Sequence, residues 1–363
     1  TFTGFIADNS IVWIVLKDMT EISGHIWNGE DFDEGSIIIE DGIVVDIMYG
    51  QPTSDENYTI IPGLVDGHTH IADAGLVLDG RYTLEELVAP PNGIKHRYLR
   101  NKSKDELILD MSDYATRLKM NGVSKFLDFR EGGVEGCSML RNASDDAIIL
   151  GRPISNEFDP NEMESILKIS DGIGISSISD MDHNYIERIA DITHRSGKKL
   201  AIHVSERIRE DIDFVLSLEP DLIIHMVQAT KDDVRKCADA DVPIVVCASS
   251  NRYFDMTPDI RMMIESGASV SIGTDNAMLS PSANIFDEFR TFNNILSTQG
   301  GSLIDAYRCL IRDGCKLLYR EFPFKFQPGM DADITIIRSS PKDITKRDQI
   351  LDIRHLTPGY RGE

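Results

Sequence analysis

The pattern of apolar residues predicts β-strands near both ends of the chain. β-Branched runs occur at Ile11–Leu16 and at Gly35–Ile47, and the second run is interrupted by an Asp41-Gly42 turn. Two such runs around Asp-Gly are typical of a β-hairpin. A similar run, Asp333–Ile337, follows a Pro-Gly turn near the other end of the chain. We therefore expect the two ends to build one small β-sandwich together.

Between these ends, short apolar runs alternate with helical patterns, as in βα units around a parallel sheet. Eight runs are predicted strands: Ile60–Val65, Ser124–Phe129, Ala147–Leu150, Gly172–Ser176, Lys199–His203, Asp221–His225, Pro243–Cys247 and Ser269–Gly273. Most of them are spaced by roughly 20 to 30 residues, about one strand plus one crossover helix. We therefore predict an α/β fold, a (β/α)8 TIM barrel over residues 62–326, with the β-sandwich formed by residues 1–61 and 327–363.

Two helices have clear start signals, and one gap between strands is unusually long. The spacing of a capping box occurs in Ser302-x-x-Asp305 and in Thr230-x-x-Asp233. After Ser302, apolar residues follow on one helical face as far as Tyr319. The gap after the first predicted strand is too long for one crossover, so we expect an inserted loop over residues 72–104 that covers the site.

Composition narrows the class of partner. An apolar fraction of 41% in 363 residues is ample for a buried core. The formal charge of -23 disfavours nucleic acid and anionic membranes, which that charge would repel, and favours a small-molecule substrate. The five cysteines contain no CxxC pair, and no apolar run reaches membrane-spanning length or resembles an export signal. We expect a soluble cytoplasmic protein. A homo-oligomer is possible, but the sequence shows no apolar stripe that would mark its interface.

Histidines and acidic residues concentrate at the predicted strand ends, where such barrels carry their catalytic groups. The first strand runs into His68-Thr69-His70, and side chains two apart on a strand project to the same face. An HxH pair alone could equally be a surface pair. However, other strands end in His203, His225 and Gly273-Thr274-Asp275. Imidazoles with a carboxylate and an open position for water are what a zinc-type cation requires, so the combination favours a metal site.

Glu206 follows His203 by three residues, which places a carboxylate beside the predicted metal-activated water. Such a group can serve as a general acid and base. The alternative is an acidic residue in the first turn of the next helix, where it would suit the helix dipole. Arg130-Glu131 ends the second strand and could bind a polar substrate group, although a buried ion pair is an equal alternative. His96 lies in the long loop, as a lid residue or a solvated histidine.

These residues resemble the amidohydrolase superfamily across essentially the whole chain. The motifs that carry the resemblance are Pro62 to His70, His203-Val-Ser-Glu206, His225 and Gly273-Thr-Asp275-Asn-Ala277, and Ser249-Ser250-Asn251 is similar to the Ser-Asn of nucleobase deaminases and chlorohydrolases. Two-metal members carry a carboxylated lysine at the end of strand four, whereas this strand reads Gly172 to Ser177 without lysine. The resemblance therefore implies one divalent metal ion per chain, Zn2+ in the first instance, with Fe2+ or Mn2+ as alternatives.

The resemblance also implies roles for individual residues. His68, His70, His203 and Asp275 would bind the metal, Glu206 would shuttle protons, and His225 would hold the attacking hydroxide or the substrate. Asp275 would also accept the proton of the water. Asn251 belongs with Arg130, Glu131 and His96 among the candidate substrate contacts.

The activity implied is hydrolytic deamination of an aminated purine, pyrimidine or related heterocycle. The alternatives are cyclic amide hydrolysis of the imidazolonepropionase type and a catalytically silent barrel. Two departures from the closest deaminases, Arg207 after the Glu and Cys247-Ala248 before Ser249, leave the substrate open.

Overall fold

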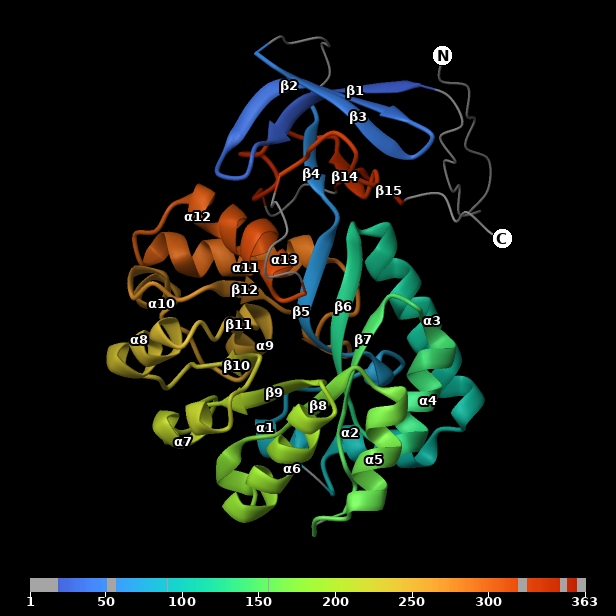
Figure 1. Cartoon of the computed structure of the whole chain (residues 1–363), viewed down its shortest axis with the longest axis vertical. Helices are drawn as coiled ribbons and strands as arrows, with labels where there is room; N and C mark the ends of the chain where they lie inside the picture. The colour runs from blue at the N-terminus through green and yellow to red at the C-terminus, as the bar shows by residue number, and fades with distance from the viewer. Residues whose placement is uncertain are drawn as a thin grey trace.

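The structure is a computed structural model that describes residues 19–50, 57–89, 91–155, 157–318, 325–346 and 351–357. These residues contain two sheets, a large parallel sheet flanked by helices and a smaller mixed sheet beside it (Figure 1). The strands of the large sheet are β5 (Leu64–His70), β6 (Val123–Arg130), β7 (Ala147–Gly151), β8 (Gly172–Ile175), β9 (Lys199–Val204), β10 (Leu222–His225), β11 (Ile244–Val246), β12 (Val270–Ile272) and β13 (Asp275–Asn276). Seven of the eight predicted barrel strands coincide with β6 to β12, whereas the first, Ile60–Val65, is divided between β4 (Thr59–Pro62) of the smaller sheet and the start of β5.

The large sheet curls until its two edges meet in one stretch of chain. Its order is β12-β11-β10-β9-β8-β7-β6-β5-β13, and only Gly273 and Thr274 separate β12 from β13. β12 pairs with β11, and β13 pairs with β5. The segment from β12 to β13, which occupies the place of the eighth barrel strand, therefore lies next to both the seventh strand, β11, and the first strand, β5. A side-chain carbon added at Gly273 would lie only 2.8 Å from His68 Cβ, which shows how closely the two edges approach. The sheet is therefore barrel-like, as predicted.

Helices flank this sheet. They are α1 (Leu84–Val88), α2 (Ile94–Asn101), α3 (Lys104–Met120), α4 (Gly133–Ala143), α5 (Pro160–Ile169), α6 (His183–Arg195), α7 (Ile212–Ser217), α8 (Lys231–Asp239), α9 (Ala248–Tyr253), α10 (Ile260–Glu265), α11 (Ile285–Thr298), α12 (Leu303–Tyr307) and α13 (Gly314–Lys316). The expected loop over residues 72–104 instead contains the helices α1 and α2, of which α1 begins at a complete capping box on Thr83. Across the described residues, none of the helices combines the length and the apolar character needed to cross a membrane.

The predicted helix from Ser302 is interrupted. It begins at the expected capping box, but a π-helical stretch, Arg308–Asp313, separates α12 from α13, and Tyr319 lies outside the described residues. A π turn shifts the following residues around the helix axis, so a uniform helical period cannot describe both halves of this segment.

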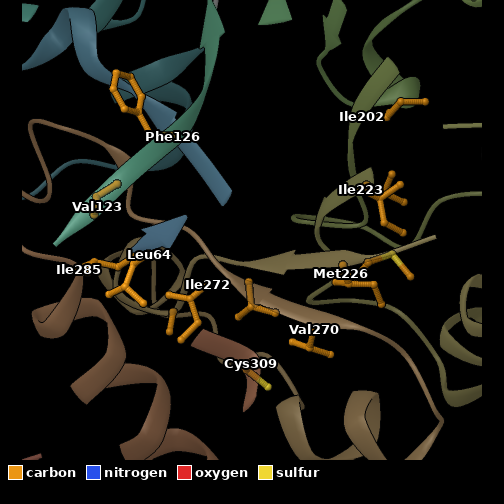
Figure 2. Close-up of a cluster of buried hydrophobic side chains, with 14 of the residues drawn as sticks. Leu64, Val123, Phe126, Ile202, Ile223, Met226, Val270, Ile272, Ile285 and Cys309 are labelled. Atoms are coloured by element: carbon orange, nitrogen blue, oxygen red, sulfur yellow. The ribbon is translucent and has the colours of Figure 1, made fainter. Parts of the chain in front are cut away.

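Alternate residues of the parallel strands belong to two separate apolar clusters. Leu200, Ile202 and Val204 of β9 pack in a cluster that also contains helix residues, and Figure 2 shows Ile202 together with Ile285 of α11 among its members. Ala201, between them, packs with Leu127, Ile224 and other inward-facing strand residues. His203 has the parity of Ala201, since successive side chains of a strand alternate between faces. The pleat of β9 therefore directs His203 into the barrel.

The smaller sheet is built from both ends of the chain. Its order is β15-β14-β4-β1-β2-β3, with β1 (Thr20–Trp27), β2 (Phe32–Glu40), β3 (Ile43–Tyr49), β4 (Thr59–Pro62), β14 (Ile334–Ile337) and β15 (Ile353–Leu356). The predicted hairpin is present, with Asp41 and Gly42 at φ of 50° and 76° between β2 and β3. The described residues form one layer here, and the predicted strand Ile11–Leu16 lies outside them, so the second layer of a sandwich stays a prediction. The predicted domain boundary at residue 61 falls inside β4.

The Thr230 capping box supports a stability prediction. Thr230 and Asp233 cap α8 reciprocally, and Asp233 accepts two hydrogen bonds of 2.7 Å from Arg209. The Arg209 guanidinium lowers the pKa of Asp233 to about 2, against a smaller effect of burial. The free energy of unfolding of Asp233→Ala should be about 1–2 kcal/mol lower at neutral pH. A carboxyl group whose pKa is lower in the folded protein than the unfolded value of 3.8 stabilises the fold at pH values above 3.8. The difference in unfolding free energy between the wild type and Asp233→Ala should therefore shrink as the pH falls from about 5 to about 2.

Urea unfolding of both proteins over this pH range measures the effect. Asp232→Ala is the matched control, because Asp232 occupies the same first turn but is exposed, with Lys236 3.9 Å away. Equal losses in the two variants, or a difference that does not depend on pH, would contradict the assignment.

Candidate functional site

Four side chains with predicted metal roles meet at the carboxyl end of the parallel strands. His68 Nε2 lies 3.3 Å from His203 Nε2 and 3.4 Å from Asp275 Oδ1. His70 Nε2 lies 3.8 Å from the same carboxylate oxygen. One ring nitrogen from each of the three histidines lies within 4.8 Å of the others. Strands β5, β9 and β13 thus bring together residues that are more than two hundred positions apart in the sequence.

The donor set fits a divalent cation of the zinc type. Nδ1 of His203 donates to the Ile175 carbonyl and Nδ1 of His70 to the Phe129 carbonyl, each at 2.9 Å, which leaves both Nε2 lone pairs free. Burial lowers the pKa of His68 to about 4 and that of His203 well below its usual value. The imidazoles of His68 and His203 are therefore neutral at physiological pH. Neutral imidazole nitrogens with one carboxylate, their outer nitrogens fixed by carbonyls, are the ligands that zinc prefers.

Asp275 is held in a conformation that non-glycine residues rarely adopt. Its φ is 62°, which costs about 1–3 kcal/mol and is found mainly where the surroundings enforce it. The preceding residue is fixed, because Thr274 N and Oγ1 donate to the Asp66 carboxylate at 3.0 and 2.6 Å. Burial alone would raise the pKa of Asp275, but the hydrogen bond from His68 holds it well below its usual value. Asp275 is thus a fixed carboxylate facing the histidines.

Glu206 and His225 form a second pair beside this cluster. His225 Nε2 lies 3.6 Å from Glu206 Oε1, and Asn251 Nδ2 donates to His225 Nδ1 at 3.3 Å. Burial, with the charge of Asp275 adding, raises the pKa of Glu206 to about 8, and burial lowers that of His225 to about 4. Glu206 precedes the start of α7 at Ile212, so it does not lie in the first turn of that helix. The helix-dipole alternative is therefore not supported.

One cavity of about 1310 Å³ opens onto these groups. Its lining includes His70, His203, Glu206, His225 and Asp275, together with residues of α1 and α2. The inserted segment thus forms a wall of the cavity, as expected for a cover over the site.

The four candidate substrate contacts separate into two pairs. Glu131 and His96 line the cavity, and His96 Nε2 lies 3.1 Å from the Val88 carbonyl. Arg130 is 2% exposed and pairs with Glu131 and with Asp128, so its position favours the ion-pair alternative. Asn251 is fully buried behind His225.

Two further residues at the site were missed by the sequence analysis. Lys95 of α2 is buried against Glu131, and its sequence context, a polar stretch of the insert, gave no signal for this. The Cys247 thiol lies within 4.8 Å of ligand atoms of His68 and Asp275. Its place at the end of a predicted strand could have indicated a position in the site, because the strands that end near His203, His225 and Asp275 also bring those residues to the site.

Comparisons with known proteins agree with this geometry. The model of the Amidohydrolase family matches residues 59–353. A protein of Methanocaldococcus jannaschii, whose name assigns no activity, is 35% identical over 94% of this chain and 95% of its own. The 5-methylthioadenosine/S-adenosylhomocysteine deaminase of Thermotoga maritima is 24% identical over 96% of this chain and 89% of its own. An adenosine deaminase from Xanthomonas campestris, solved with bound zinc, superposes with a TM-score of 0.73 at 14% identity, covering 91% of this chain and 87% of that one.

At 14% identity the solved structure shows the fold alone, whereas the family model covers most of the chain and the archaeal relative nearly all of it. The chain belongs to the amidohydrolase family.

Proposed function

We propose that this chain is a hydrolytic deaminase of an aminated purine, pyrimidine or related heterocycle, with one divalent cation, in the first instance Zn2+, at His68, His70, His203 and Asp275. The observation that carries the proposal is the convergence of these side chains with Glu206 and His225 on one cavity. The deaminase name of the Thermotoga maritima relative supports the reaction type.

The carboxyl groups divide the proton transfers between them. A bound divalent cation would supply the Lewis acidity that lowers the pKa of water to about 7. Asp275, held as a carboxylate, accepts the proton that the attacking water loses. Glu206, whose pKa is about 8, holds a proton at neutral pH and passes it to the departing amine. Two carboxyl groups with pKa values shifted in opposite directions are suited to base and acid roles.

His225 and the cavity position the substrate. Because Asn251 Nδ2 donates to His225 Nδ1, the neutral ring carries its proton on Nε2, which points toward Glu206. That N–H can donate to the oxygen or nitrogen at the reacting carbon. A cavity of about 1310 Å³ exceeds the volume of about 300–1,000 Å³ that small-molecule sites usually have, so a base with an attached sugar can be accommodated.

The test is ammonia release from a panel of aminated bases and nucleosides by the zinc-loaded protein. We expect turnover of at least one panel member, with one ammonia released per product and about one zinc per chain by elemental analysis. Opening of cyclic amides without any ammonia would replace deamination by the imidazolonepropionase type of reaction. Tight zinc binding without turnover of either panel would favour the catalytically silent barrel, and two zinc ions per chain would contradict the mononuclear assignment.

A further inference from the structure

Helix α2 places a buried lysine next to the candidate metal centre. Lys95 is 2% exposed, although lysine is almost never fully buried unless paired. Its ammonium lies 2.6 Å from Glu131 Oε1 and donates to Asn276 Oδ1 at 3.0 Å. Asp73 Oδ2 is 3.8 Å away, and the Asp73 side chain is fully buried. Lys95 therefore makes three polar contacts inside the barrel mouth, to residues from three different segments of the chain.

Two of these contacts continue to candidate metal ligands. Glu131 Oε1, which contacts Lys95, also lies 3.0 Å from His70 Nδ1. Asn276 accepts from Lys95 through Oδ1 and donates through Nδ2 to Asp275 Oδ1 at 2.8 Å. Two short series of polar contacts thus begin at the Lys95 ammonium. One leads through Glu131 to His70 of β5, and the other leads through Asn276 to Asp275 of β13.

We propose that Lys95 is a positioning residue of the metal centre, which fixes Glu131 against His70 and Asn276 against Asp275. The proposal rests on the proposed function only in taking His70 and Asp275 as metal ligands. Partners that hydrogen-bond to the side chains of metal ligands orient them, and their loss typically weakens metal binding about 10- to 100-fold.

The direction of the effect follows from the acceptor oxygens to which the Lys95 ammonium donates. Without Lys95, the Asn276 carboxamide loses the contact that selects its orientation, and the flipped amide would turn an oxygen toward the Asp275 carboxylate. Glu131 and Asp73 would also lose the cation between them and separate, because two carboxylates repel each other in a buried site. Both changes draw Asp275 and His70 away from a common centre.

The experiment measures the affinity of the metal-free, full-length protein for Zn2+ by competition with a chromophoric chelator. Lys95→Met, which keeps the length of the side chain, should bind Zn2+ about 10- to 100-fold more weakly. The visible absorption of the Co2+-loaded variant should change as well, since it reports ligand geometry and not stability. Lys102→Met is the matched control, because Lys102 lies in the same insert and its ammonium contacts Asp110 at 3.0 Å instead. It should leave Zn2+ affinity and the Co2+ spectrum unchanged.

Asn276→Ala provides a second route if Lys95→Met fails to fold. This substitution removes the hydrogen bonds that link Lys95 to Asp275 and leaves the Lys95–Glu131 pair in place. It should therefore also weaken Zn2+ binding by about tenfold or more. The double variant should lose less than the product of the two single effects. Zn2+ affinity in both single variants within twofold of the wild type, or tighter, would overturn the proposal, as would equal losses in Lys102→Met. Because no substrate enters this measurement, failure of the deaminase screen would leave its outcome intact.

Discussion

Glu206→Gln is expected to lower turnover about 1000-fold while the protein keeps its cation. The glutamine has the same shape and can still occupy the position 3.6 Å from His225 Nε2, but it can neither release nor accept a proton in the reaction. General acid–base catalysis contributes about 100- to 10,000-fold, and removal of an interaction made only in the transition state lowers kcat and kcat/KM together. Steady-state kinetics on the best panel substrate and elemental analysis of the purified variant measure the two quantities.

Glu210→Gln separates this effect from a disturbance of the loop after β9. Glu210 accepts from Ser205 N at 2.7 Å and from Ser179 N at 2.8 Å, so its carboxylate supports the loop without facing the histidines. We expect Glu210→Gln to lower thermal stability and to reduce turnover less than tenfold. If Glu206→Gln retained more than a tenth of the wild-type kcat, or if it lost its cation, the assigned role of Glu206 would be wrong.

Much of the candidate site followed from two regularities of strands. Parallel strands place their carboxyl ends at one edge, so His203, His225 and Asp275 could be expected to meet although the chain separates them. Residues two apart on a strand share a face, which placed His68 and His70 together. Both regularities depend only on backbone geometry. The same reasoning predicted the eight barrel strands, because their apolar runs must fill a layer on each side of the sheet.

The inserted segment was not predictable in the same way. Lys95 belongs to a polar helix, and its burial depends on Glu131 and Asn276, which meet it only after β6 and β13 have been assembled. The Lys95 ammonium thus finds its partners in other parts of the chain, and no local pattern of apolar residues records such a pairing.

His203→Asn is expected to weaken Zn2+ binding more than about 100-fold and to abolish turnover at low metal concentrations. The asparagine amide can replace Nδ1 as the donor to the Ile175 carbonyl, so the variant keeps that hydrogen bond and loses Nε2 alone. Zinc sites with four protein ligands bind with about 10–16 kcal/mol, so an equal share for one ligand is about 2.5–4 kcal/mol, and the middle of that range corresponds to over 100-fold in affinity. Competition with a chromophoric chelator measures the loss.

Thermal unfolding with and without Zn2+ gives an independent readout of the same prediction. A ligand that binds only the folded state raises the melting temperature in proportion to the logarithm of its concentration over Kd, so wild-type protein should gain more from Zn2+ than His203→Asn. His194→Asn is the control, because His194 contacts the Leu218 carbonyl at 2.9 Å on α6, away from the cluster. Its Zn2+ affinity should equal that of the wild type. If His203→Asn bound Zn2+ and turned over substrate like the wild type, the cation would have to sit elsewhere, because no other described imidazole lies 3.3 Å from His68 Nε2 to replace it.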